Sequence, residues 1–140
     1  MIEGSKHEPV GAHLVPEKIE ELCDYVNQHW EHVTAIHLSA YIMWRLNWIH
    51  PFADGNGRTS RMLSYAVLCI RTGEVLPGRR TIPEQIVDNR GPYFDALDAA
   101  DQADREGRLD LGAMEALLES LLAQQLMSVY AAAGGKVLDR

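Results

Sequence analysis

The twelve residues from His50 to Arg61, HPFADGNGRTSR, constrain the fold of this chain more than any other stretch. They separate two apolar segments, residues 35–49 and 62–70, each long enough for a helix and too short to cross a membrane. The stretch is therefore a loop between two helices. It contains one imidazole, one carboxylate, two glycines around an asparagine, and two arginines. Chemistry on a phosphate group needs side chains of these kinds.

The apolar pattern on both sides predicts an all-α fold, with about six or seven helices around a central antiparallel helix pair. The segment Ala35–Ile49 is apolar on nearly every face, which is typical of a buried central helix, and Thr34 is a plausible N-cap. Pro51 should end this helix, because the residue before a proline is disfavoured in the helical conformation. Arg58–Arg71 is predicted as a second buried helix that stops at Gly73.

The rest of the chain divides into an N-terminal arm, a single domain and a tail. Residues 1–15 show no helical period and predict an extended segment or hairpin arm. Residues 16–130 form the domain, and residues 131–140 are expected to fray. Its abrupt start leaves open that the chain is a domain of a longer protein. Further helices are expected from Pro16 to Trp30, from Glu84 to Asn89, from Pro92 onwards and after a capping Asp110.

Composition narrows the classes of function. A chain of 140 residues can bury a core, and its formal net charge of −7 argues against general binding to nucleic acid. No apolar segment predicts a membrane span or a signal peptide. Cys23 and Cys69 lie in apolar helical patterns, so we expect buried thiols. These features favour a cytoplasmic protein.

The loop has the features of an anion-binding site. It lies at the N-terminus of the second helix, where unpaired N–H groups attract anions. Gly55 and Gly57 permit positive φ and a close approach of the backbone to a ligand, and Asn56 adds an amide donor. Arg58 and Arg61 are three residues apart and project from one face of the first turn, against the helix dipole. A ligand with several negative charges would resolve that conflict.

Two further groups extend the site. Asp54 offers a hard oxygen ligand of the kind that Mg²⁺ uses beside phosphates. His50 has an ordinary pKa of ~6.5, which suits removal of a proton near neutral pH. Taken singly, a Gly-Asn-Gly turn and a backbone-bonded histidine are more often structural. A transition-metal site built on His50 and Asp54 is a poor alternative, since no second histidine or cysteine lies nearby.

The stretch HPFADGNGRTSR resembles the motif of the Fic family, HPF-x-(D/E)-GN-(G/K)-R-x-x-R, at every fixed position. The resemblance extends from about residue 4 to residue 125. It implies the helical Fic fold, with the motif between two central helices and a small N-terminal β-hairpin flap. Most members transfer AMP from ATP to a Ser, Thr or Tyr hydroxyl of another protein. The implied substrates and partners are therefore ATP with Mg²⁺ and a target protein.

The resemblance also implies a role for each matching residue. His50 would be the base that deprotonates the target hydroxyl, and Asp54 would hold Mg²⁺ between the α- and β-phosphates. Phe52 would point into the core and lock the loop. The phosphates would be bound by Gly55, Asn56 and Gly57, with Asn56 near the α-phosphate, by Arg58 at the β- or γ-phosphate, and by Arg61 at the γ-phosphate.

Two other segments are similar to family regions. The segment NRGPYFDAL resembles the wall of the adenosine pocket and places Tyr93, Phe94 and Asp101 beside the nucleotide. Relatives often carry tyrosine and asparagine where this chain has Phe94 and Asp101. The segment GSKHEPVGAHLVP resembles the flap that positions the target by strand addition, which implies that role for Lys6, His7 and Glu8.

Substitutions within the motif separate related activities. Gly57 is not the lysine of Doc-like kinases, and Gly55 is not the alanine of some phosphocholine-transferring members. The family's inhibitory pattern (S/T)-x-x-x-E-(G/N) does not occur in this sequence, which suggests inhibition by a missing helix, by a separate partner, or no inhibition. The alternatives that stay open are transfer of UMP, GMP or phosphocholine, removal of AMP, or an idle Fic module that binds or regulates. A homodimer through the outer helix faces is also open.

Overall fold

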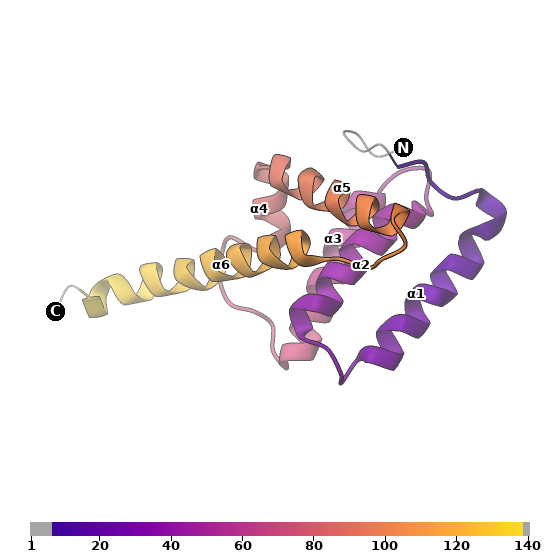
Figure 1. Ribbon diagram of the computed structural model, residues 1–140. Coiled ribbons are helices and arrows are strands. Elements are labelled where there is room, and N and C mark those ends of the chain that lie inside the picture. The colour runs from indigo at the N-terminus through magenta and orange to yellow at the C-terminus, as the bar shows by residue number, and fades with distance from the viewer. Residues whose placement is uncertain (1–6, 139–140) are drawn as a thin grey trace.

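The computed structural model describes residues 7–138, including the side chains of residues 7–129. Within this part of the chain every regular element is helical (Figure 1), which confirms the all-α prediction. The β-hairpin flap is not seen in residues 7–15, where a short 3-10 helix forms instead. The elements are η1 (Ala12–Leu14), α1 (Val15–His29), α2 (Ala35–Ile49), α3 (Asn56–Thr72), α4 (Ile82–Asp88), α5 (Gly91–Arg105) and α6 (Gly112–Leu138).

Helix α2 is the central element, as its apolar sequence predicts. The hydroxyl oxygen of Thr34 accepts a hydrogen bond of 3.0 Å from the backbone N–H of His37 and so caps the first turn. Leu38, Ile42 and Ile49 are at most 1% exposed. The helix contacts α1, α3, α5 and α6, and a helix with neighbours on all sides needs an apolar surface all round.

Helix α3 packs against α2 and runs antiparallel to it (Figure 1). Only the inner face of α3 is buried. There the hydroxyls of Ser39 and Ser64 each donate to the backbone carbonyl of the other residue, at 3.1 and 2.8 Å. Small side chains at this contact let the two helices approach closely. On the outer face Met62 and Ile70 are 59% and 66% exposed. The prediction of a second buried helix is therefore correct for one face of α3 and wrong for the other.

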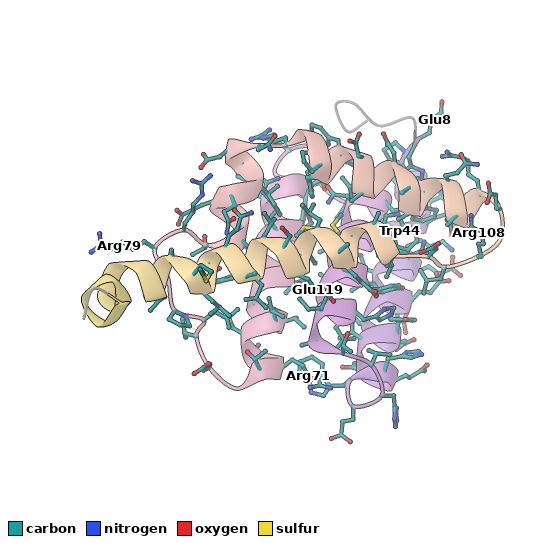
Figure 2. All side chains as sticks on the ribbon, turned by 60° about the vertical axis from the view of Figure 1, so that its left-hand side comes forward. Glu8, Trp44, Arg71, Arg79, Arg108 and Glu119 are labelled. Carbon is teal, nitrogen blue, oxygen red and sulfur yellow. The ribbon has the colours of Figure 1, made fainter. Side chains whose placement is uncertain are left out.

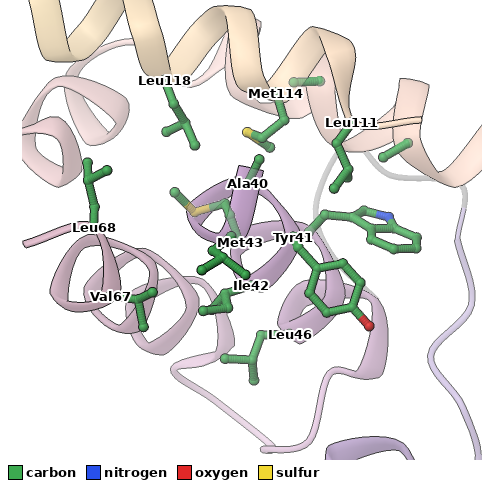
Figure 3. Packing of buried hydrophobic residues seen from close by; sticks show 14 of the residues in the cluster. Ala40, Tyr41, Ile42, Met43, Leu46, Val67, Leu68, Leu111, Met114 and Leu118 are labelled. Atoms are coloured by element: carbon green, nitrogen blue, oxygen red, sulfur yellow. The ribbon is translucent and has the colours of Figure 1, made fainter. Parts of the chain in front are cut away.

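Helix α6 covers α2 from the opposite side. Leu111, Met114 and Leu118 reach towards Ala40 and Met43 of α2 (Figure 3), and all five residues are buried. The helix begins where the sequence predicts, because a carboxylate oxygen of Asp110 accepts a 2.9 Å hydrogen bond from the N–H of Gly112. It continues to Leu138, and the fraying predicted for residues 131–140 stays a prediction.

Two expectations about the surface can also be checked. Cys23 on α1 is exposed and Cys69 on α3 is partly buried, so the prediction of two buried thiols is wrong for Cys23. An apolar neighbourhood in the sequence does not decide which face of an amphipathic helix a residue occupies. None of the helices within residues 7–138 combines the length and the hydrophobicity needed to cross a bilayer.

Candidate active site

A cavity of about 410 Å³ lies where α2 ends and where α3 and α5 begin. A volume of this size is typical of small-molecule sites. Of the motif residues with a predicted role, all but Phe52 line the cavity, together with the predicted aromatic pair of α5. Its lining residues are Asn47, His50, Ala53, Asp54, Gly55, Asn56, Gly57, Arg58, Arg61, Arg90, Tyr93 and Phe94.

His50 ends α2 in a backbone conformation that few side chains adopt. Its φ of 55° and ψ of 59° are left-handed, and no other non-glycine residue among those described has a positive φ. Pro51 thus follows the helix end as predicted, although His50 is left-handed rather than extended. The backbone N–H of His50 donates to the carbonyl of Leu46 at 2.9 Å.

The surroundings of His50 disfavour the protonated form of its imidazole. Its Nδ1 atom is buried and has no hydrogen-bond partner among the described residues. Burial is the main cause that lowers the pKa of His50 below 6.5, and the nearby imidazole of His7 lowers it further. The side chain can therefore accept a proton near neutral pH, because little of it is already protonated.

Asn56 holds the loop between α2 and α3 in place. Its Oδ1 accepts a hydrogen bond from the N–H of Phe52 at 2.9 Å, and its Nδ2 donates to the carbonyl of Phe52 at 2.7 Å. The ring of Phe52 does not lock the loop from the core, as the resemblance implied, because Phe52 is 50% exposed. The loop is locked through the backbone of Phe52, and the lock is the buried side chain of Asn56.

The two glycines of the loop serve different purposes. Gly55 has a φ of 87° and is the N-cap of α3, so it needs the conformational freedom that we predicted. Gly57 lies inside the helix and has no positive φ, which corrects the prediction for that residue. A Cβ atom on Gly57 would lie 2.8 Å from Nη1 of Arg61. Gly57 therefore makes room for a guanidinium group.

Arg61 is a buried cation that forms no ion pair with a carboxylate of the described residues. It is 8% exposed, and its guanidinium carbon lies 5.9 Å from the centre of the Tyr93 ring. A buried charge without a partner is costly, and the N-terminal end of α3 adds positive potential. An anion in the cavity would relieve both effects.

Asp54 and Arg58 lie at the exposed edge of the cavity. Their Oδ2 and Nη2 atoms are 3.5 Å apart, and their side chains are 96% and 71% exposed. Mg²⁺ commonly takes one or two carboxylates and completes its shell with phosphate and water oxygens. The accessible carboxylate of Asp54 fits a Mg²⁺ ion shared with a phosphate ligand. No cluster of three His, Cys, Asp or Glu side chains suited to a metal occurs in the described part of the chain.

Two residues that were not named individually from the sequence also line the cavity, Asn47 and Arg90, of which Arg90 falls within the segment NRGPYFDAL that was predicted to form a pocket wall. Asn47 is 2% exposed, and its Nδ2 donates to Oγ of Ser60 and to the hydroxyl oxygen of Tyr93, both at 2.8 Å. It thereby joins α2, α3 and α5 behind the cavity. An asparagine within an otherwise apolar segment was the available signal. Arg90 directly precedes α5 and adds a third arginine to the lining.

Of the three residues predicted to contact the nucleoside, two line the cavity and one does not. Tyr93 and Phe94 line the cavity. The prediction that Asp101 contacts the nucleotide is not supported, because Asp101 is buried and does not line the cavity. Its Oδ1 accepts a 2.8 Å hydrogen bond from the indole N–H of Trp44, which lies in the interior (Figure 2).

Of the predicted flap residues, His7 and Glu8 do not line the cavity. Lys6 is beyond the described residues. Nε2 of His7 is 2.8 Å from the carbonyl oxygen of Trp48, near the end of α2. Glu8 is exposed and projects from the edge of the molecule (Figure 2). The target-positioning role of this segment stays a prediction.

An imidazole that lines one cavity with two arginines at a helix N-terminus defines the general class of the site, a pocket for an anionic ligand beside a base. Comparison with known proteins narrows this class. A family model described as Fic/DOC family matches residues 1–68, which include the whole loop. The chain belongs to the Fic/DOC family.

The similar proteins are all much longer than this chain. Protein adenylyltransferase fic-1 of Caenorhabditis elegans is 30% identical over 100 residues, which are 69% of this chain and 18% of that protein. Protein adenylyltransferase Fic of Drosophila virilis is 38% identical over 85 residues, 55% of this chain and 16% of that protein. Protein adenylyltransferase Fic of Drosophila persimilis is 39% identical over 79 residues, which are 53% of this chain and 14% of that protein. The chain thus spans less than a fifth of these relatives.

Proposed function

We propose that this chain transfers AMP from ATP to a Ser, Thr or Tyr hydroxyl of a target protein. The observation that carries the proposal is the convergence of His50, Arg61 and the N-terminus of α3 on one cavity. The membership of the Fic/DOC family and the name adenylyltransferase of the relatives support the same reaction.

The triphosphate would bind at the start of α3. Unpaired N–H groups of the first helical turn would donate to its oxygens, and Gly57 leaves Arg61 room to lie beside them. Arg58 would exchange its exposed partner Asp54 for a phosphate. A Mg²⁺ ion held by Asp54 would neutralise charge on the phosphate oxygens. These groups position the ligand and offset its charge, which is most of what phosphoryl chemistry requires of a protein.

The proton step would use Nε2 of His50. The target hydroxyl oxygen attacks the α-phosphorus, a new P–O bond forms, and the bond to the β-phosphate oxygen breaks so that pyrophosphate leaves. Nε2 takes the hydroxyl proton, which requires the neutral tautomer with its proton on Nδ1, the buried ring nitrogen. The lowered pKa keeps Nε2 unprotonated between turnovers. General-base assistance of this kind contributes ~10²–10⁴ in rate.

The nucleoside would rest against the start of α5. The hydroxyl of Tyr93 is held by Asn47 at 2.8 Å and the residue is 2% exposed, so its position is fixed. Phe94 is only partly buried and offers an aromatic face to a base. Recognition of the base by Asp101, as the resemblance implied, is not part of the proposal.

The test is incubation of the chain with a cell lysate, Mg²⁺ and ATP labelled either at the α- or at the γ-phosphate. Label from the α position alone should appear on protein, and mass spectrometry should find an added AMP. Asp54→Asn should abolish labelling, whereas Asp95→Asn, an exposed carboxylate of α5 outside the cavity, should not. Transfer of the γ label would indicate a kinase, and no transfer by the folded chain would contradict the proposal.

A further inference from the structure

The end of α2 is capped by a residue from the N-terminal segment. Carbonyls in the last turn of a helix lack intrahelical donors. Nε2 of His7 donates to the carbonyl oxygen of Trp48 at 2.8 Å. The next N–H in helical register, that of Phe52, already donates to Oδ1 of Asn56. His7 therefore supplies from outside the helix the donor that the local chain cannot supply.

The indole of Trp48 is held as well as its carbonyl. The rings of His7 and Trp48 stack with centroids 4.9 Å apart and planes 23° apart. The guanidinium of Arg45 lies 4.1 Å from the centre of the same indole, and its Nη2 is 3.9 Å from a carboxylate oxygen of Glu21 on α1. Trp48 is thus fixed from two sides of the chain, by the N-terminal segment and by α1 through Arg45.

His50, two residues after Trp48, depends on this support. A left-handed backbone costs about 1–2 kcal/mol in a residue with a Cβ atom, so surrounding contacts must hold it. In many catalytic histidines a hydrogen bond to the second ring nitrogen orients the imidazole. Nδ1 of His50 has no such partner among the described residues. Within the described residues, its orientation is therefore set by the backbone, and hence by the contacts that fix the end of α2.

We propose that His7 is a positioning residue for His50: its hydrogen bond to the carbonyl of Trp48 and its stacking on that indole keep the imidazole of His50 turned into the cavity. The role of His50 as the base rests on the proposed function, whereas its placement by His7 does not. This role is separate from the target-positioning role predicted for the flap, and the two can be distinguished.

The first experiment is an NMR titration of the His50 imidazole, with its resonance assigned by loss in His50→Gln. In His7→Ala the pKa of His50 should rise towards 6.5, because both its burial and the neighbouring imidazole are reduced. His7→Gln retains an N–H donor and should give a smaller change, and Glu8→Ala should give none. The charged groups that share the cavity, Asp54, Arg58, Arg61 and Arg90, are the same in all these proteins.

The second experiment measures transfer kinetics on the same variants. His7→Ala should lower kcat by ~10-fold or more with an unchanged KM for ATP, because a small displacement of a base is sufficient to slow the reaction. If only the KM for the target protein rises and the His50 resonance is unchanged, His7 is a docking residue and the proposal is overturned. Should His7→Ala fail to fold, His7→Gln and Trp48→Phe provide the same readouts. An inactive wild type would refute the proposed function and leave the NMR result valid.

Discussion

Two histidines, His37 and His50, lie near opposite ends of α2 and differ in the hydrogen bonds of their ring nitrogens. His37 has both ring nitrogens bonded: Nδ1 donates to Oε1 of Glu115 at 2.6 Å, and Nε2 accepts from the hydroxyl of Tyr25 at 2.7 Å. Tyr25 stacks on Tyr41 with centroids 3.8 Å apart. His50 lines the cavity and has no partner for Nδ1 among the described residues.

The difference separates a histidine whose side chain joins elements of the fold from one whose side chain lines the cavity. The bonds of His37 join α1, α2 and α6, and burial together with Glu115 raises the pKa of Tyr25, so the hydroxyl stays a donor. No ring nitrogen of His37 is left for a substrate. The side chain of His50 forms no hydrogen bond with another described residue, and its backbone position is strained. The imidazole of His50 is therefore available to a ligand in the cavity.

The largest expected effect is on the reaction. His50→Ala should lower AMP transfer by ~10²–10⁴, because the base is removed while the phosphate site is intact. His50→Gly should do the same and stabilise the fold by about 0.5–1 kcal/mol, since glycine adopts positive φ without strain. Radiolabel transfer and urea unfolding would measure the two effects. Full activity in His50→Ala would remove the distinction between the two histidines.

The converse change should affect stability and spare the reaction. His37→Ala leaves the Tyr25 hydroxyl and the Glu115 carboxylate without their partner and should reduce the free energy of unfolding by ~1–3 kcal/mol. Glu115→Gln keeps an acceptor for Nδ1 and should have a smaller effect. Urea unfolding at neutral pH measures both. A His37→Ala protein that is fully stable but inactive would reverse the assignment.

The parts of the fold that the sequence predicts are those decided by local physics. Thr34, Pro51 and Gly73 mark helix ends through their own backbone preferences, and all three mark a helix end in the structure. The bond between His37 and Glu115 joins residues 78 positions apart, and no local spacing indicates it. The exposed outer face of α3 could not be predicted either, because an apolar residue on a helix does not reveal whether a neighbour covers it.

The candidate site divides in the same way. The charge, hydrogen-bonding capacity and spacing of twelve residues were enough to predict that His50, Asp54 and Arg61 share one site, and all three line the cavity. The prediction failed where a role depends on a distant partner. Asp101 faces the indole of Trp44 instead of the cavity, and Asn47 joins three helices behind it.

A smaller effect should come from the space beside Arg61. In Gly57→Ala the new Cβ would lie 2.8 Å from Nη1 of Arg61, so the guanidinium must leave its position beside the first turn of α3, where the proposed phosphate site lies. We expect affinity for ATP to fall by ~10-fold, about 1.4 kcal/mol, with the fold retained. Gly91→Ala is the matched control, because its nearest atom would be 3.9 Å away and its φ is not positive. Isothermal titration with ATP and Mg²⁺ measures both. Equal affinities would show that Arg61 does not need this space.

The smallest expected effect is a pH dependence of stability that belongs to His50 alone. Its pKa is lowered by burial in the folded protein, whereas the unfolded chain binds the same proton at about 6.5. Between these two pKa values the unfolded state binds more protons than the folded state, so the free energy of unfolding rises with pH. The stability that the neutral His50 contributes is lost as the pH falls through that interval. Above 6.5 the contribution is constant.

In urea unfolding, His50→Gln should therefore lose less stability than the wild type between neutral and mildly acidic pH. Parallel curves of stability against pH for the two proteins would mean that burial does not disfavour the charged imidazole. The same burial disfavours protonation of the proposed base. The rate of AMP transfer should therefore fall with decreasing pH only below 6.5, in the interval where the stability also falls.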